Sequence, residues 1–120
     1  RLLPEQPCEN DFIVEYIARH SLKQGDDGWI WKFHPPAMGA SRWEEPFHEH
    51  LQNMRCRTAY VHGQKSALIG KPQLEYIAGL MKPESPIVEM PDAHHHMMLD
   101  QPMAFIAAIR SIIDCWRRLK

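Results

Sequence analysis

Three consecutive histidines, His94, His95 and His96, are the residues of this sequence best suited to chemistry. An imidazole accepts and releases a proton near neutral pH, as a general base must. The histidines follow a short apolar run, residues 87–90, and precede an apolar stripe of helical spacing that begins at Pro102. A turn between a strand and a helix lies at the strand's carboxyl end, where ligand sites of open α/β sheets are found. This turn is therefore the candidate active site.

The same histidines could instead bind a metal ion. Neighbouring side chains in an extended turn point in different directions, whereas a zinc site needs three or four converging ligands. Residues 48–50, His-Glu-His, could add ligands, but no spacing brings them to the turn. The three cysteines, Cys8, Cys56 and Cys115, form no C-x-x-C pair. We therefore expect no metal and no cofactor, and keep a histidine-rich metal-binding protein as the weaker alternative.

The elements around the turn alternate between strand and helix. Residues 58–62 and 87–90 are short, apolar or β-branched runs typical of strands, and residues 71–81 have helical spacing. From Pro102 onward, apolar residues recur every three or four positions, at Phe105, Ile109, Ile112, Trp116 and Leu119, with Ile106 and Ile113 widening the stripe. This order predicts an α/β fold with parallel strands. Two such strands cannot form a sheet buried on both faces, so we expect residues 57–120 to belong to a larger α/β core.

Residues 1–56 have a different character. Residues 9–24 predict a helix, the G-D-D-G run at 25–28 ends it, and residues 29–33 alternate as in an extended segment. A short helix is predicted over 43–53. Since no strand here is long enough to complete the sheet, we interpret residues 1–56 as a cap or lid segment. Trp29 and Trp31 either pack in its core or line a substrate site.

Composition limits the classes of partner. The 120 residues carry 14 Lys and Arg against 15 Asp and Glu, a formal net charge of −1. Such a balance argues against binding nucleic acid or an anionic membrane. No apolar run approaches the ~20 residues of a membrane-spanning helix. The odd cysteine count and the lack of a signal-like apolar start predict a cytoplasmic location. Because the chain begins with Arg1 and not Met, we expect a processed product or a fragment.

The turn resembles the catalytic-histidine loop of α/β-hydrolase-fold proteins. In that family an Ala or Gly precedes the histidine, and the seventh residue after it is the proline that starts the last helix. Pro102 is the seventh residue after His95, and Ala93 stands two residues before His95. Residues 61–63, Val-His-Gly, resemble the penultimate strand and its glycine turn, and residues 29–35 resemble a Trp-rich cap segment in a lyase-like and esterase-like branch. The resemblance implies the C-terminal part of such a fold, with a cap over 1–56, the core over 57–120 and His95 as base.

Two departures from the family pattern qualify this expectation. None of the five serines lies in a G-x-S-x-G context, so the resemblance implies that the nucleophile precedes Arg1. The usual acid position, three residues after Gly63, holds Ser66, which cannot stabilise an imidazolium by charge. The acid then comes from an earlier strand or has been lost; Asp92 is too close to His95 in sequence to orient it.

The implied reaction is hydrolysis of an ester, amide or carbon–carbon bond in a small-molecule substrate by a nucleophile–His–acid relay. The chain alone would be inactive. It would need the missing N-terminal half of the same fold as its partner, or it would associate with itself. The alternative favoured by Ser66 is a non-catalytic, α/β-hydrolase-like binding or signalling protein.

Overall fold

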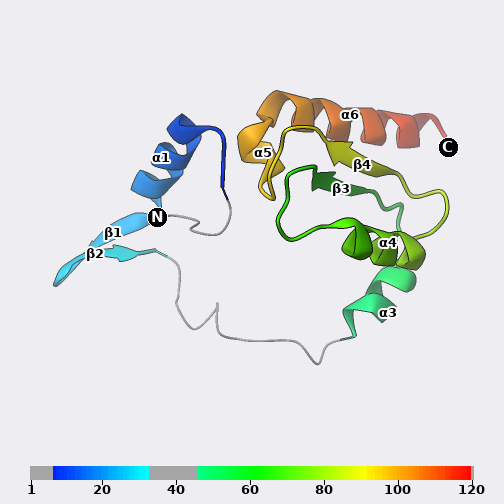
Figure 1. Ribbon diagram of the computed structural model, residues 1–120, viewed down its shortest axis with the longest axis horizontal. Coiled ribbons are helices and arrows are strands. Elements are labelled where there is room, and N and C mark those ends of the chain that lie inside the picture. The colour runs from blue at the N-terminus through cyan, green and yellow to red at the C-terminus, as the bar shows by residue number, and fades with distance from the viewer. Residues whose placement is uncertain (1–6, 33–45, 120) are drawn as a thin grey trace.

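The second half of the chain forms a β–α–β unit closed by a long helix. A computed structural model describes residues 7–32 and 46–119 (Figure 1). Strand β3 (Tyr60–Gly63), helix α4 (Lys71–Leu80) and strand β4 (Ile87–Met90) are followed by the short helix α5 (Met97–Asp100) and by α6 (Pro102–Arg118). The two strands are parallel, with Tyr60 opposite Ile87 and Gly63 opposite Met90. The predicted parallel pairing is thus confirmed, with β3 placed about two residues later than expected.

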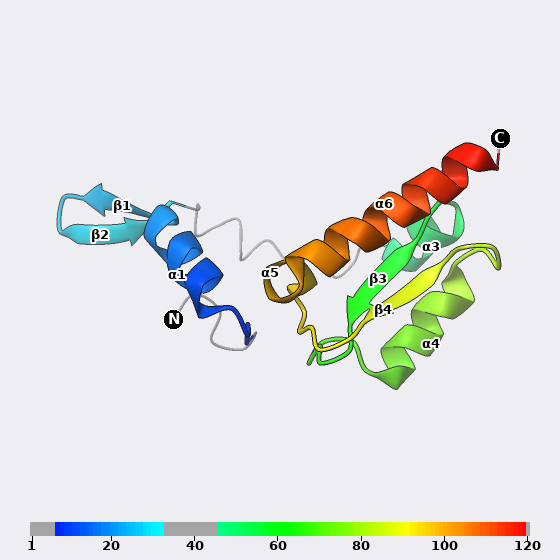
Figure 2. The ribbon, with the colours of Figure 1, turned by 90° about the horizontal axis from the view of Figure 1, so that it is seen from above.

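Helices α4 and α6 lie on opposite faces of the two strands, which gives three layers (Figures 1 and 2). Helix α6 begins with a proline, whose fixed φ suits the first turn, and ends with Arg117 and Arg118, whose charges suit the carboxyl end of the helix dipole. The predicted stripe is partly confirmed. Its members Phe105, Ile109, Ile112 and Trp116 are half-buried, whereas Leu119, Ile106 and Ile113 are exposed.

The first half differs from its prediction in one element. Helix α1 (Asp11–His20) ends earlier than expected, and strand β1 (Leu22–Gly25) pairs antiparallel with β2 (Gly28–Trp31). The expectation that the helix continues to residue 24 is therefore wrong. Asp26 and Asp27 form a two-residue loop, and Gly28 adopts a φ of 127°, which is open to glycine and strained for other residues. The G-D-D-G run is thus a hairpin turn and not only the end of a helix.

Helix α3 (Phe47–Gln52) packs against α4 and forms the described part of the helix predicted over 43–53. The start of that helix, and residues 33–35 of the Trp-rich segment, lie outside the described residues. None of the helices in the described ranges has both the length and the apolar character needed to cross a bilayer.

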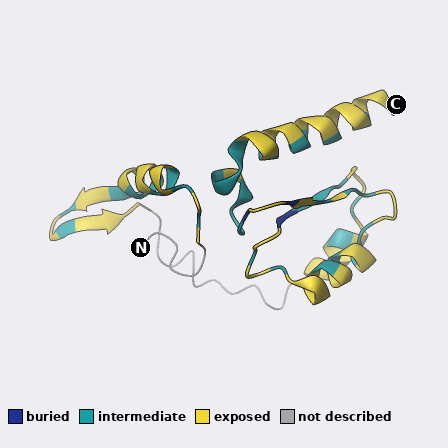
Figure 3. Ribbon diagram, turned by 45° about the horizontal axis from the view of Figure 1, so that its top comes forward, coloured by how far each residue is buried: buried dark blue, intermediate teal, exposed yellow. Residues whose placement is uncertain are grey.

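The best-buried residues gather at the carboxyl ends of the two strands. Within the described ranges, the buried positions are Met90 and Ala93 on one side and His62 and Gly63 on the other. Much of the remaining apolar surface of the helices is exposed (Figure 3). The densest packing therefore supports the histidine turn.

Candidate active site

The turns that follow β3 and β4 are joined to each other by hydrogen bonds. The Gln64 N–H donates to the Met90 carbonyl oxygen at 2.9 Å, and the Lys65 N–H donates to the Ala93 carbonyl oxygen at 2.8 Å. In return, the Asp92 N–H donates to Gln64 Oε1 at 3.1 Å. Residues 91–96, which we call the histidine loop, are therefore fixed along the turn after β3.

Gly63 makes this close approach possible. A Cβ atom built on Gly63 would lie 2.1 Å from the His94 carbonyl oxygen and 2.4 Å from that of Ala93. Both atoms are backbone atoms and cannot swing aside, so any larger residue would push the histidine loop away. In the turn after β4, Asp92 adopts a φ of 52°, a left-handed conformation that Asp tolerates better than most residues. The chain turns sharply at this position, just before the histidines.

His94 is held by a buried carboxylate. The Asp100 side chain has no exposed surface. Its Oδ2 accepts a hydrogen bond from the His94 N–H at 2.6 Å and lies 3.2 Å from His94 Nδ1. Its Oδ1 accepts from the N–H of Glu9, 91 residues away in sequence, at 2.7 Å. A charged acceptor makes both bonds stronger than neutral ones, on the order of 1.5–3 kcal/mol each.

These bonds also set the ionisation of Asp100. Burial alone would raise the pKa of its carboxyl group, but hydrogen bonds from the His94 N–H, the Cys8 thiol, the Glu9 N–H and the His94 ring outweigh it and lower the pKa below the usual 3.8. The same surroundings raise the pKa of the Cys8 thiol, chiefly through its burial. Asp100 is therefore an anion at neutral pH. The spacing of residues around Pro102 does not predict this role of Asp100.

His95 is in a different situation from His94. It is half-buried, and its ring meets the His96 ring edge-on, with centroids 5.1 Å apart and planes at 64°. Its imidazole makes no hydrogen bond with any residue in 7–32 or 46–119. His96 contributes to the loop structure through its backbone. Its carbonyl oxygen accepts a hydrogen bond from the Leu99 N–H at 2.8 Å, at the start of α5. Neither the His95 ring nor the His96 ring has a hydrogen-bond partner in the described residues, whereas His94 Nδ1 is occupied by Asp100.

Ser66, at the position where the resemblance expects an acid, closes its own turn. Its hydroxyl oxygen accepts from the Leu68 N–H at 3.3 Å, and its N–H donates to the Gly63 carbonyl oxygen at 3.1 Å. The nearby His62 is 5% exposed, and its Nδ1 has no hydrogen-bond partner in the described part of the chain. No described carboxylate replaces the missing acid beside His95.

Trp29 and Trp31 lie on β2, with 70% and 38% of their surface exposed. Helix α1 lies between this hairpin and the histidine loop in both views (Figures 1 and 2). The described residues reach the loop from the first half of the chain through Cys8 and Glu9 instead. Lining of a substrate site by the two tryptophans stays a prediction.

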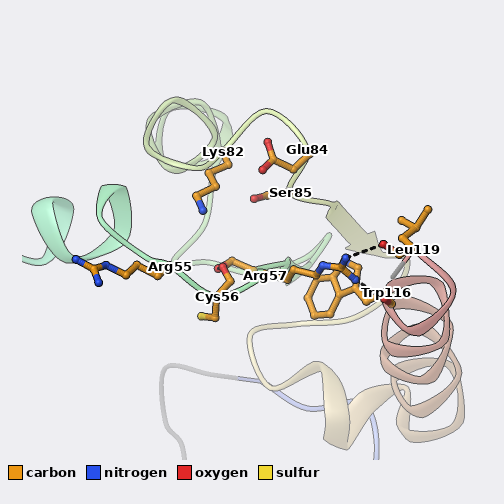
Figure 4. Close-up of a pocket in the computed structure, with 9 residues that line it drawn as sticks. Arg55, Cys56, Arg57, Lys82, Glu84, Ser85, Trp116 and Leu119 are labelled. Carbon is orange, nitrogen blue, oxygen red and sulfur yellow. Dashed lines mark hydrogen bonds between the residues drawn. The ribbon is translucent and has the colours of Figure 1, made fainter.

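A separate hollow of about 320 Å³ lies at the amino ends of the strands, away from the histidine loop (Figure 4). It is bounded by residues 55–58, by the 82–85 turn and by the end of α6. At its wall, the Arg57 guanidinium donates to the carbonyl oxygens of Trp116 and Leu119 and so satisfies the carboxyl end of α6. In the described residues, no three His, Cys, Asp or Glu side chains converge as metal ligands.

No family model matches the sequence, and no curated protein matches it. Two solved structures are similar in fold. The crystal structure of E-2-(acetamidomethylene)succinate hydrolase is 22% identical with a TM-score of 0.73, over 81% of this chain and 37% of that one. A thioesterase domain from the curacin biosynthetic pathway is 17% identical with a TM-score of 0.63, over 88% of this chain and 44% of that one.

The chain thus spans less than half the length of either protein. Sequence identities this low are evidence for the fold alone. The structural similarity agrees with the architecture described above: parallel strands with a helix on each face and a histidine loop before the last helix. This chain therefore has the α/β-hydrolase fold, in the portion that holds its last two strands and its last helix.

Proposed function

We propose that this chain supplies the histidine side of a hydrolase active site. His95 acts as general base in the cleavage of a small ester, amide or carbon–carbon bond, and the nucleophile lies outside these 120 residues. The observation that carries the proposal is the state of His95. Its half-buried imidazole has no hydrogen-bond partner in the described residues, and its loop is fixed at the carboxyl ends of two parallel strands.

The chemistry uses the neutral form of the imidazole, whose unprotonated nitrogen accepts a proton. His95 would take the proton of the nucleophile as it attacks, pass it to the leaving group, and then activate the water that releases the product. The imidazolium formed in this step needs a carboxylate to orient and stabilise it. Ser66 is uncharged, and Asp100 is saturated by Glu9 and His94. The acid is therefore expected outside this chain, like the nucleophile.

The substrate would lie between the histidine loop and a cap formed by residues 1–56, with Trp29 and Trp31 against its apolar part. The names of the two similar structures agree with this class of reaction, since one is a hydrolase and the other a thioesterase domain. Both names denote cleavage of a substrate bond by water, and neither fixes the bond that this protein cleaves.

A second candidate is a non-catalytic binding or signalling protein of the same fold. One observation favours it. Ser66 stands at the usual acid position, but its hydroxyl oxygen accepts a hydrogen bond from the Leu68 N–H in the same turn and makes none with a histidine of the described residues. This candidate keeps the shape of the site and lacks a complete proton relay.

The test is the hydrolysis of p-nitrophenyl esters, a thioester and an anilide by the longer protein that contains this chain, with the 120-residue chain as control. We expect turnover of at least one substrate class by the longer protein and none above free imidazole by the chain. Binding of these compounds without turnover would favour the second candidate. Turnover by the chain alone would refute the placement of the nucleophile.

A further inference from the structure

The first and second halves of the described chain meet at one buried charge. Asp100 joins the backbone of residue 9, just ahead of α1, to the backbone of residue 94 in the histidine loop, with bonds of 2.7 and 2.6 Å. Its side chain has no exposed surface. Both of these bonds are donated by backbone N–H groups, and His94 Nδ1 makes a further contact of 3.2 Å with the same Oδ2.

A second contact between the same segments is exposed. Lys65 Nζ lies 3.3 Å from Glu9 Oε1 and 3.2 Å from Asp92 Oδ1, and these two hydrogen bonds raise the pKa of the lysine. Water and salt screen this ion pair, and its side chains are free to move apart. The Asp100 side chain has no exposed surface, so salt screens its bonds less, and they hold residue 9 against the loop more firmly than the ion pair does.

We propose that Asp100 is a positioning residue that couples the segment preceding α1 to the histidine loop and thereby sets the place of His95. The two bonds use opposite oxygens of one carboxylate, so a shift of either backbone disturbs the other. His95 directly follows His94, whose N–H Asp100 holds. The His95 ring has no hydrogen bond of its own in the described residues to fix its position. The effect of Asp100 on turnover rests on the proposed function; the coupling itself does not.

The first experiment measures amide hydrogen exchange at residues 9 and 94 in the 120-residue chain. Asp100→Asn keeps the shape but turns one acceptor oxygen into an N–H donor that faces a backbone donor. We expect exchange at both amides to accelerate at least tenfold. The matched control is Asp114→Asn on α6, an exposed carboxylate 3.4 Å from Arg117, which should change neither. Acceleration at one amide alone, at neither, or uniformly along the chain would overturn the coupling.

A pair of variants at residue 9 separates its N–H from its side chain. Glu9→Pro removes the donor to Asp100, whereas Glu9→Ala keeps the donor and loses only the exposed ion pair to Lys65. We expect Glu9→Pro, and not Glu9→Ala, to accelerate exchange of the His94 amide. Equal exchange rates in the two variants would show that residue 9 does not reach the loop through Asp100.

Kinetics of the longer protein test the consequence for His95. We expect Asp100→Asn to lower kcat at least tenfold and to leave KM for a minimal ester within twofold, because the base is displaced and the binding groups are not. If His95→Ala abolishes turnover and Asp100→Asn leaves kcat unchanged, the positioning role is wrong. If exchange responds as expected but His95→Ala retains full turnover, the proposed function fails and the coupling stands.

Discussion

At the scale of single residues, Gly63 is the position that the histidine loop tolerates least. The space for its Cβ is taken by two backbone oxygens, at 2.1 and 2.4 Å. Gly63→Ala should lower the free energy of unfolding by about 3 kcal/mol, the upper end of the cost of overpacking, because backbone atoms cannot move aside. Urea unfolding measures the change.

The matched control is Gly79→Ala on α4, where a Cβ meets nothing within 4 Å. In the middle of a helix this substitution should instead raise the free energy of unfolding by about 1 kcal/mol. If the two substitutions changed stability in the same direction, the loop would not lie against Gly63.

The carboxylate of Asp100 makes the free energy of unfolding decrease at acidic pH. Its pKa is lowered in the folded state, so its contribution to the free energy of unfolding is complete above the ordinary value of 3.8 and is lost as pH falls through the lower folded-state value. Asp100→Asn removes this titration, and we expect its stability to vary less between pH 5 and pH 2 than that of the wild type. Parallel curves for the two proteins, measured by urea unfolding at each pH, would contradict the role assigned to Asp100.

At the scale of elements, the carboxyl end of α6 depends on a residue far away in sequence. Arg57 donates to the carbonyl oxygens of Trp116 and Leu119 through two nitrogens of one guanidinium (Figure 4). A lysine presents its three donors from a single nitrogen and lacks the planar fork of the guanidinium, so it does not reproduce this pair of bonds. Arg57→Lys should cost about 1 kcal/mol or less, since the site is exposed.

Arg55→Lys is the control for Arg57→Lys, because Arg55 lines the same hollow and makes no hydrogen bond within the described residues. We expect helical content near the end of α6, read by amide exchange of residues 117–119, to fall only in Arg57→Lys. Equal fraying in both variants would show that the guanidinium does not secure the helix end.

The elements with a clear apolar periodicity or a clear place in the strand–helix alternation could be predicted from the sequence. Helix α6 and the pairing of β3 with β4 follow from apolar periodicity and from the alternation of strand and helix. Strand β1 could not be found in this way. No Gly or Pro separates Leu22 from the preceding helix, and only pairing across the Gly25–Gly28 turn makes the segment extended.

The candidate site, too, could be predicted only in part from the sequence. The offsets of Ala93 and Pro102 pointed to the loop and to His95. The role of Asp100 could not be predicted, because it depends on residue 9 returning to the loop from 91 positions away. No local spacing encodes such a contact.

At the scale of the whole molecule, the described chain leaves apolar surface without a partner. In the described residues β3 pairs only with β4, and Met103 and Ile106 on α6 are 76% and 48% exposed. An open strand edge and apolar helix faces favour association. We expect the 120-residue chain to associate with itself and to sediment above its monomer mass of 14.0 kDa. A clean monomer would contradict the need for neighbouring strands.

The central claim is that His95, and not either neighbour, is the base. The direct measurement is kcat of the longer protein with His94, His95 and His96 each replaced by alanine. We predict a loss of several orders of magnitude for His95→Ala and small losses for the other two, because His94 serves the loop mainly through its backbone N–H and His96 through its carbonyl oxygen. Equal losses in all three variants, or the largest loss in His94→Ala, would contradict the claim.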